Sequence, residues 1–358
     1  MRFEYHTRYA DSFALLRHAN QRWIYGALLL TLGVLPWLVT PFFMGELTYV
    51  FILCIASLGL MVLTGYTGQV SLGHAAFVAI GAYAHAWFLS KGWPLPLSLL
   101  GAALLSGAMG LVVGIPAIRV SGLYLAMVTM AFAIIVEQVI GLWSSVTGGF
   151  TGLSVNSPTL FGFNLGTGHA FYYFCLVVLM LTLLGLVNLL RSSTGRALVG
   201  VRDSEAAAYA LGIHVQSVKI AAFALSAAVT GLAGALLAHH LNYLTPDGFT
   251  LQLSLELVLM VVIGGLGSLR GAILGAVLIS LLPTGISSLK TILPAAMAKQ
   301  FGFEIFIFGF VLAFFVLFEP TGLNGRWLKV RALLETFPLY RKNTFKRNKR
   351  YMKSERYR

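Results

Sequence analysis

Long runs of apolar residues, separated by short polar segments, cover most of the chain. Many runs approach the ~20 residues that a helix needs to cross a bilayer. They predict helices at 24–40, 47–64, 70–89, 95–115, 122–142, 170–190, 219–241, 253–266, 271–283 and 301–318. The polar faces that a large soluble helical core would show are mostly missing. The pattern therefore predicts an all-α polytopic transmembrane protein of about 8–10 spans, including short broken or re-entrant helices.

Two glycine-rich segments interrupt this pattern. The candidate residues are Gly65, Gly68, Ser71, Gly73 and His74 in the first, and Gly264, Gly265, Gly267 and Ser268 in the second. The runs 253–266 and 271–283 each give about 20 Å of helix, which is short of a ~30 Å hydrocarbon core. Non-helical backbone at membrane depth usually lines a cavity, so both segments are predicted to line a translocation path. Their similar order of residues also suggests inverted structural repeats.

Composition supports the membrane assignment and argues against catalysis. Hydrophobic residues make up 58% of the chain and charged residues 10%, against about 25% charged residues in a typical soluble domain. Cys54 and Cys175 lie in apolar runs and are expected to be packing residues. The sequence has no HExxH, CxxC or G-x-S-x-G motif. We therefore expect no enzyme activity, no cofactor and no metal site.

Positive charge predicts the orientation and the division of the chain. The basic start 1–23 and the basic segment 191–219 are separated by six predicted spans, so both are expected in the cytoplasm. The transmembrane region is predicted at 24–320 and a basic cytoplasmic tail at 321–358. Residues 326–358 hold 12 Lys and Arg against Glu335 and Glu355. This tail is expected either against anionic lipid headgroups or solvated and disordered, and not on nucleic acid.

The segment 191–219 is polar in an otherwise apolar chain, and its centre predicts one short helix. Asp203 or Ser204 can cap the first turn, Glu205 suits the positive end of the helix dipole, and Gly212 can end the helix in a left-handed conformation. A helix with so little side-chain bulk suits a groove on a partner. The residues predicted to dock there are Asp203, Ser204, Glu205, Ala206, Ala207, Tyr209 and Gly212.

Ionisable residues within the apolar runs are further candidates for the path. His74, Glu137 and Glu256 are the main examples, and buried charge in a membrane usually faces water or the protein interior. Each of them either lines the path or forms a structural hydrogen bond between helices.

The short helix resembles the EAA–Gly loop of ATP-binding-cassette (ABC) importer permeases, in which this loop is a coupling helix that docks on the ATPase. Four longer stretches, in the same order as in the family, resemble branched-chain amino acid permeases of the LivM type. These stretches are 65–83, 146–155, 195–213 and 261–276. The resemblance spans roughly residues 47–320 and leaves out both ends of the chain.

The resemblance implies a transport subunit in a bacterial inner membrane with both termini in the cytoplasm. Its implied partners are a second permease chain in a heterodimer, two cytoplasmic ATP-binding subunits and an extracytoplasmic substrate-binding protein. The chain has no G-x-x-x-x-G-K-[ST] sequence, so ATP hydrolysis is expected on other chains. The implied cargo is leucine, isoleucine and valine.

Other functions stay open from the sequence. A permease for urea, another small amide or a hydrophobic acid has the same features. An ion-coupled secondary transporter or a channel would also suit broken helices and membrane glutamates. An integral membrane enzyme would need a cluster of catalytic groups, which the sequence does not show.

Overall fold

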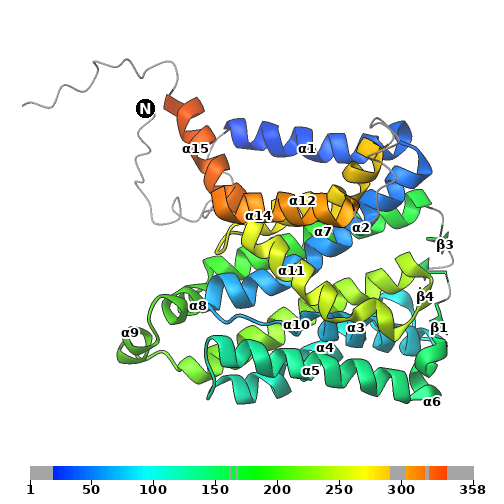
Figure 1. Ribbon diagram of the computed structural model, residues 1–358, viewed down its shortest axis with the longest axis horizontal. Coiled ribbons are helices and arrows are strands. Elements are labelled where there is room, and N and C mark those ends of the chain that lie inside the picture. The colour runs from blue at the N-terminus through cyan, green and yellow to red at the C-terminus, as the bar shows by residue number, and fades with distance from the viewer. Residues whose placement is uncertain are drawn as a thin grey trace, which may run out of the picture.

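The computed structural model describes residues 19–155, 157–160, 163–166, 168–290, 303–318 and 322–336 (Figure 1). The long helices are α1 (Ala19–Leu38), α2 (Pro41–Leu60), α3 (His74–Ser90), α4 (Leu95–Ala117), α5 (Leu123–Leu142), α7 (Gly168–Arg191), α10 (Val215–Leu241), α11 (Leu251–Gly264), α12 (Leu269–Lys290), α14 (Phe303–Phe318) and α15 (Gly322–Thr336). The short helices and turns are η2 (Met61–Gly65), α6 (Ser144–Thr147), η3 (Gly149–Thr151), α8 (Ser193–Asp203), α9 (Glu205–Ala210) and η4 (Pro246–Phe249). The strands are β1 (Leu153–Ser154), β2 (Thr159–Leu160), β3 (Phe163–Asn164) and β4 (Tyr243–Leu244).

Seven helices within the described ranges are long and apolar enough to cross a membrane. They are Pro41–Gly65, Leu95–Ala117, Leu123–Leu142, Gly168–Arg191, Val215–Leu241, Pro246–Gly264 and Leu269–Ser288. Two shorter apolar helices, Trp23–Leu38 and Phe306–Phe315, accompany them. Large apolar side chains such as Leu104 on α4 and Leu142 on α5 face outward, as expected where helices meet lipid. The predicted all-α polytopic membrane fold is confirmed.

One of these helices is longer than its apolar run predicted, and a second is extended by a preceding turn. α12 continues past Pro283 to Lys290 and contains that proline, because a packed membrane bundle can satisfy the backbone groups that a proline leaves free. α11 is preceded by the 3-10 turn η4. The resulting spans of 19 and 20 residues are about 30 Å long, enough for one crossing. The predicted short helix at 271–283 was therefore wrong, because α12 has 22 residues. α11 itself has the 14 residues predicted for 253–266, shifted by two positions, and the glycines between the two helices form a turn.

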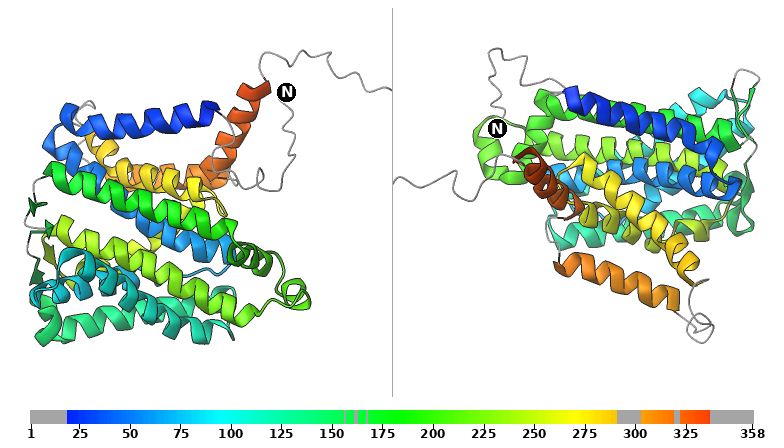
Figure 2. Two further views of the ribbon diagram at one scale, coloured as in Figure 1. Left: turned by 180° about the vertical axis from the view of Figure 1, so that it is seen from behind. Right: turned by 90° about the horizontal axis from the view of Figure 1, so that it is seen from above.

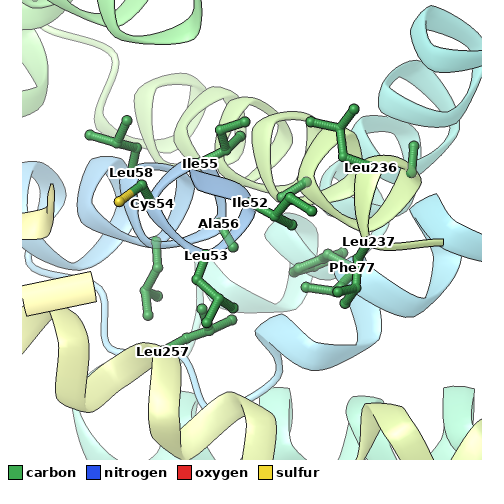
Figure 3. Packing of buried hydrophobic residues seen from close by; sticks show 14 of the residues in the cluster. Ile52, Leu53, Cys54, Ile55, Ala56, Leu58, Phe77, Leu236, Leu237 and Leu257 are labelled. Carbon is green, nitrogen blue, oxygen red and sulfur yellow. The ribbon is translucent and has the colours of Figure 1, made fainter. Parts of the chain in front are cut away.

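The centre of the bundle is built from α2 and α10. In the most apolar 18 residues of each helix, 83% of the residues of α2 and 67% of those of α10 are buried. α10 packs on α4, α3 and α2. Figure 3 shows Leu53 and Ile55 of α2 among Phe77 of α3, Leu237 of α10 and Leu257 of α11. These two helices form the frame on which the glycine-rich segments rest.

The two ends of the bundle differ in structure. α8 and α9 protrude at one end, and the short strands lie at the other (Figure 1). β1 and β4 pair antiparallel, with Leu153 opposite Leu244, and β2 pairs antiparallel with β3. The β1–β4 pair ties the segment after α5 to the segment after α10. The predicted orientation, which is not tested by the fold, would put α8 and α9 in the cytoplasm.

The terminal helices lie at the edge of the bundle (Figure 2). α1 packs on α7, where Trp37 Nε1 donates to the Tyr173 hydroxyl at 3.1 Å and the Tyr172 hydroxyl donates to the Leu32 carbonyl at 2.9 Å. α1 begins within the predicted N-terminal segment 1–23, and α15 lies within the predicted tail 321–358. Residues 1–18 and 337–358 lie outside the described residues. The predicted division into segments therefore stays a prediction.

Candidate functional site

The predicted short helix at the centre of 191–219 is present as α9. Ser204 has an extended backbone, and its Oγ accepts a hydrogen bond from the Ala207 N–H at 3.2 Å, so Ser204 is the cap. Gly212 has φ +81° and its N–H donates to the Tyr209 carbonyl at 3.0 Å, which ends the helix as predicted. Asp203, the alternative cap, instead accepts hydrogen bonds from Arg202.

α9 presents an apolar tip to solvent. Ala208 faces the bundle and is buried, whereas Tyr209 is 75% exposed and Leu211 is 82% exposed. Two large apolar side chains at the tip of a protrusion are typical of a surface that another protein covers. The structure leaves all the residues predicted to dock exposed, namely Asp203, Ser204, Glu205, Ala206, Ala207, Tyr209 and Gly212.

An ion pair fixes α9 to the central helix α10. Lys219 Nζ lies 2.7 Å from Glu205 Oε1, and the Lys219 side chain is only 6% exposed. Burying an ammonium group is costly unless it is paired. The ion pair with Lys219 therefore fixes the position of Glu205 at the start of α9. Sequence reasoning assigned Glu205 to the helix dipole and did not single out Lys219, because 14 residues separate the two.

A second contact joins the same segment to the glycine-rich segments. Arg202, near the end of α8, donates from Nη1 to the Gly65 carbonyl at 3.1 Å. Its Nε and Nη2 donate to Asp203 Oδ1 at 3.0 and 2.9 Å. Sequence reasoning missed Arg202. The only available signal was a basic residue next to Asp203.

Some of the predicted path residues meet at one place. A Cβ added at Gly65 would lie 2.8 Å from the Gly267 nitrogen, and one at Gly264 would lie 2.0 Å from the Gly271 carbonyl oxygen. Gly265 and Gly267 have φ of +109° and +80°, which favours glycine there. We call the residues 65–68 and 264–268 the two glycine turns. They lie beside Arg202, at the end of the bundle that carries α9.

Tyr66 belongs to this place as well. It follows Gly65 directly and is half-buried. Burial raises the pKa of its hydroxyl, and a hydrogen bond with the Leu269 backbone and the positive charge of Arg202 partly oppose that rise. The hydroxyl therefore stays protonated and neutral at physiological pH.

The remaining residues of the first segment lie deeper in the bundle. Ser71 and His74 are fully buried. Ser226 Oγ donates to the Gly59 carbonyl at 2.7 Å, so it accepts from His74 Nε2 at 2.7 Å, and Ser71 Oγ donates to His74 Nδ1 at 3.0 Å. Gly73 packs on α5. This is the hydrogen bonding between helices that the sequence left open as the alternative for His74, and a role in the path stays a prediction.

Serine side chains satisfy the helix starts next to both segments. Ser254 Oγ of α11 accepts from the Ala75 N–H of α3 at 2.9 Å. Ser268 Oγ accepts from the Gly271 N–H at 3.0 Å and donates to the Gly265 carbonyl at 3.2 Å. The free N–H groups in the first turn of each helix thus find partners. Ser268 acts here as the cap of α12.

Glu137 and Glu256 are not brought to the glycine turns. Glu256 lies eight residues before Gly264 on α11, about 12 Å along the axis, and accepts from Gln252 Nε2 at 3.2 Å. Glu46 at the start of α2 accepts from Thr284 Oγ1 at 3.2 Å. Glu46 and Glu256 each lie in the first half of their helix, away from the glycine turns that follow the helix ends. Sequence reasoning did not consider Glu46.

Glu137 is half-buried on α5. It lies eight residues beyond Thr129, whose Oγ1 accepts from the Leu72 N–H at 3.0 Å. This places Glu137 about 12 Å along α5 from the first glycine segment. Across the part of the chain that the structure describes, no group of three or more His, Cys, Asp or Glu side chains could hold a metal ion.

The model of one protein family, the permease component of branched-chain amino acid transport systems, matches residues 43–318. The chain belongs to this permease family. The match includes α9, Arg202, Lys219 and both glycine turns, and it leaves out the two ends of the chain.

Individual relatives agree with the family. The chain is 34% identical over 282 residues to the high-affinity branched-chain amino acid transport system permease protein LivM of Salmonella typhimurium, and 33% identical over 282 residues to that of Escherichia coli. Each alignment covers 71% of this chain and 65% of the relative. The probable branched-chain amino acid transport permease protein LivH of Methanocaldococcus jannaschii is 26% identical over 308 residues, which cover 82% of this chain and 95% of the relative. No solved structure matches the chain significantly.

Proposed function

We propose that this chain is the membrane-spanning permease subunit of an ABC importer for branched-chain amino acids. The observation that carries this proposal is α9, a capped helix that protrudes from the bundle, is fixed to α10 by Glu205 and Lys219, and exposes Tyr209 and Leu211. A channel or an ion-coupled transporter has no need of such an apolar tip. Membership in the permease family supports the same conclusion.

In this proposal the chain works with partners that supply energy and substrate. Two cytoplasmic ATP-binding subunits hydrolyse ATP, and one of them receives α9. A second permease chain completes the conduit, most simply as a heterodimer, and an extracytoplasmic binding protein delivers the substrate. The membrane is the bacterial inner membrane, with both termini on the cytoplasmic side.

The chemistry of a zwitterionic amino acid suggests how the path is divided. The ammonium group needs an acceptor, which Glu46 and Glu256 offer at the end of the bundle opposite α9. The apolar side chain needs apolar walls, which the bundle offers throughout. The two glycine turns form the cytoplasmic end of the path in this proposal, because their close backbone contact is the place that can open with little side-chain rearrangement.

The test is uptake of labelled leucine or labelled urea into proteoliposomes that contain the full set of subunits, with and without ATP. The proposal expects leucine uptake that requires ATP and the ATP-binding subunits. ATP-dependent uptake of urea alone would keep the importer and change its cargo. Uptake that follows an ion gradient without the ATP-binding subunits would show a secondary transporter and overturn the proposal.

A further inference from the structure

Arg202 contacts its neighbour Asp203 and two segments that are far from it in the sequence. Its guanidinium donates to the Gly65 carbonyl at 3.1 Å and to Asp203 Oδ1 at 2.9 and 3.0 Å. A Cβ added at Gly267 would lie 2.9 Å from Arg202 Nη1, and one at Gly68 would lie 3.3 Å from Arg202 Cγ. One side chain thus touches both glycine turns while its other edge is bound to Asp203, the residue before the α9 cap.

The carbonyl that Arg202 holds is free to accept this bond. Gly65 is the last residue of the π-helical turn η2, and carbonyls at the end of a helix lack partners within the helix. π-helical turns in α-helices often occur at functional sites. The guanidinium is a planar fork with five donors, so it can hold the Gly65 carbonyl and the Asp203 carboxylate at the same time.

The two glycine turns respond as a unit because they touch. A Cβ at Gly65 would lie 2.8 Å from the Gly267 nitrogen, so neither turn can shift toward the other. Next to this contact, the side-chain amide of Gln69 is buried and has no hydrogen-bond partner among the described residues. An unsatisfied buried amide disfavours the arrangement that contains it. The buried Gln69 amide therefore favours a rearrangement of this part of the chain.

The connection from α9 to Arg202 is short and stiff. Ser204 is the single residue between α8 and α9, and its N–H donates to the Gly200 carbonyl at 3.1 Å. Glu205 is held by the buried Lys219 at 2.7 Å. A movement of α9 therefore cannot be absorbed by a flexible linker, and it displaces the end of α8 that carries Arg202.

We propose that Arg202 is a positioning residue that passes the movement of α9 to both glycine turns. This inference rests on the proposed function, since it requires that α9 be moved by an ATPase. In one state the Arg202 fork holds the turns together. When α9 moves, the fork withdraws from the Gly65 carbonyl and frees the turns to separate.

The test measures labelled leucine uptake and ATP hydrolysis together in the reconstituted full complex. Arg202→Ala is expected to lower leucine transported per ATP hydrolysed by about tenfold, which corresponds to loss of a charge-assisted hydrogen bond. Arg202→Lys keeps the charge but loses the fork, so it is expected to give an intermediate ratio. Both variants should extract from the membrane as complete complexes. A normal ratio in Arg202→Ala would overturn the inference.

A matched control lies on the same helix. Arg196 is exposed, and its Nη1 bonds the Arg191 carbonyl at 3.4 Å. Arg196→Ala is expected to keep the wild-type ratio, and an equal loss in both alanine variants would overturn a specific role for Arg202. If the complex with Arg202→Ala does not assemble, Arg202→Lys is the test variant. A wild-type ratio of leucine transported per ATP hydrolysed in Arg202→Lys would overturn the role of the guanidinium fork. Failure of the wild type to couple uptake to ATP would instead refute the proposed function.

Discussion

Lys219 carries a buried charge, so its stability depends on the ion pair with Glu205. Glu205→Gln removes the partner and leaves the ammonium buried alone, whereas Lys219→Met removes the buried charge and leaves Glu205 in contact with water. We expect Glu205→Gln to destabilise the contact of α9 with α10 by about 1–2 kcal/mol, less than for a fully buried pair because Glu205 is 53% exposed. Lys219→Met should cost less.

Limited proteolysis of the 203–214 segment measures this difference. The double variant Glu205→Gln/Lys219→Met should recover most of the resistance that Glu205→Gln loses, because the unpaired ammonium is gone. If the two single variants were cleaved at equal rates, or the double variant behaved as their sum, the buried charge would not be the cause.

Leu211 has a different role, because it contacts solvent and not the bundle. Leu211→Asp should leave the fold intact but weaken binding of the ATP-binding subunit by tenfold or more, about what loss of an apolar contact at the centre of an interface costs. Co-purification of the subunits at increasing detergent dilution gives the measurement. Leu211→Met keeps an apolar tip and serves as the control. Equal binding of the Asp and Met variants would argue against docking through α9.

Single residues were predicted well where the cause is local. The Ser204 cap and the Gly212 stop follow from neighbours within one helical turn. The partners of Arg202 and Lys219 were not predicted, because Gly65 lies 137 residues from Arg202 and such contacts arise only when the helices pack. The same limit applies to Glu46, whose hydrogen-bond partner Thr284 lies 238 residues away.

At the scale of elements, the contact between the glycine turns makes a sharp prediction. Gly65→Ala would bring a Cβ to 2.3 Å from Met61 Sδ and 2.8 Å from the Gly267 nitrogen. The methionine can move, but the backbone of the second turn cannot move without α11 and α12. We expect Gly65→Ala to lower the free energy of unfolding by about 1–3 kcal/mol, the usual cost of overpacking. We also expect it to lose uptake.

Gly185→Ala is the matched control for this change. A Cβ at Gly185 on α7 meets nothing within 4 Å, and alanine favours a helix interior over glycine. Thermal unfolding of the purified variants in detergent should therefore show Gly185→Ala equal to or slightly above the wild type. A Gly65→Ala variant that unfolds at the wild-type temperature would show that the turns are not in contact.

Elements were predicted from the sequence wherever the apolar run decided them. The positions of α2, α4, α5 and α7 follow from runs of apolar residues alone. Apolar runs did not predict the start of α3 at His74, which depends on partners such as Ser226. They also did not predict the continuation of α12 past Pro283, which depends on neighbouring helices. α8 was not predicted, since its mixed composition resembles a polar loop and its place depends on packing against α7 and α10.

The whole molecule has two different ends and one continuous frame between them. α2 and α10 join the end with α9 to the end with Glu46 and Glu256, so both proposed ends of the path are attached to the same two helices. The chain belongs to the branched-chain permease family, and the charge distribution predicts the side of the membrane on which each end lies. Docking of an ATP-binding subunit on α9 requires α9 to face the cytoplasm.

Side-specific labelling tests this claim most directly. Leu211, directly after α9, and Phe150, in η3 between α6 and β1, are exposed. α9 lies at the opposite end of the bundle from α6 and β1 (Figure 1). Leu211→Cys and Phe150→Cys thus place one thiol at each end, and the native Cys54 and Cys175 are buried. With a membrane-impermeant maleimide, the account predicts that Leu211→Cys reacts only from the cytoplasmic side, more slowly when the ATP-binding subunits are present, and that Phe150→Cys reacts only from outside. Labelling of Leu211→Cys from outside, or at a rate that the ATP-binding subunits do not change, would contradict it.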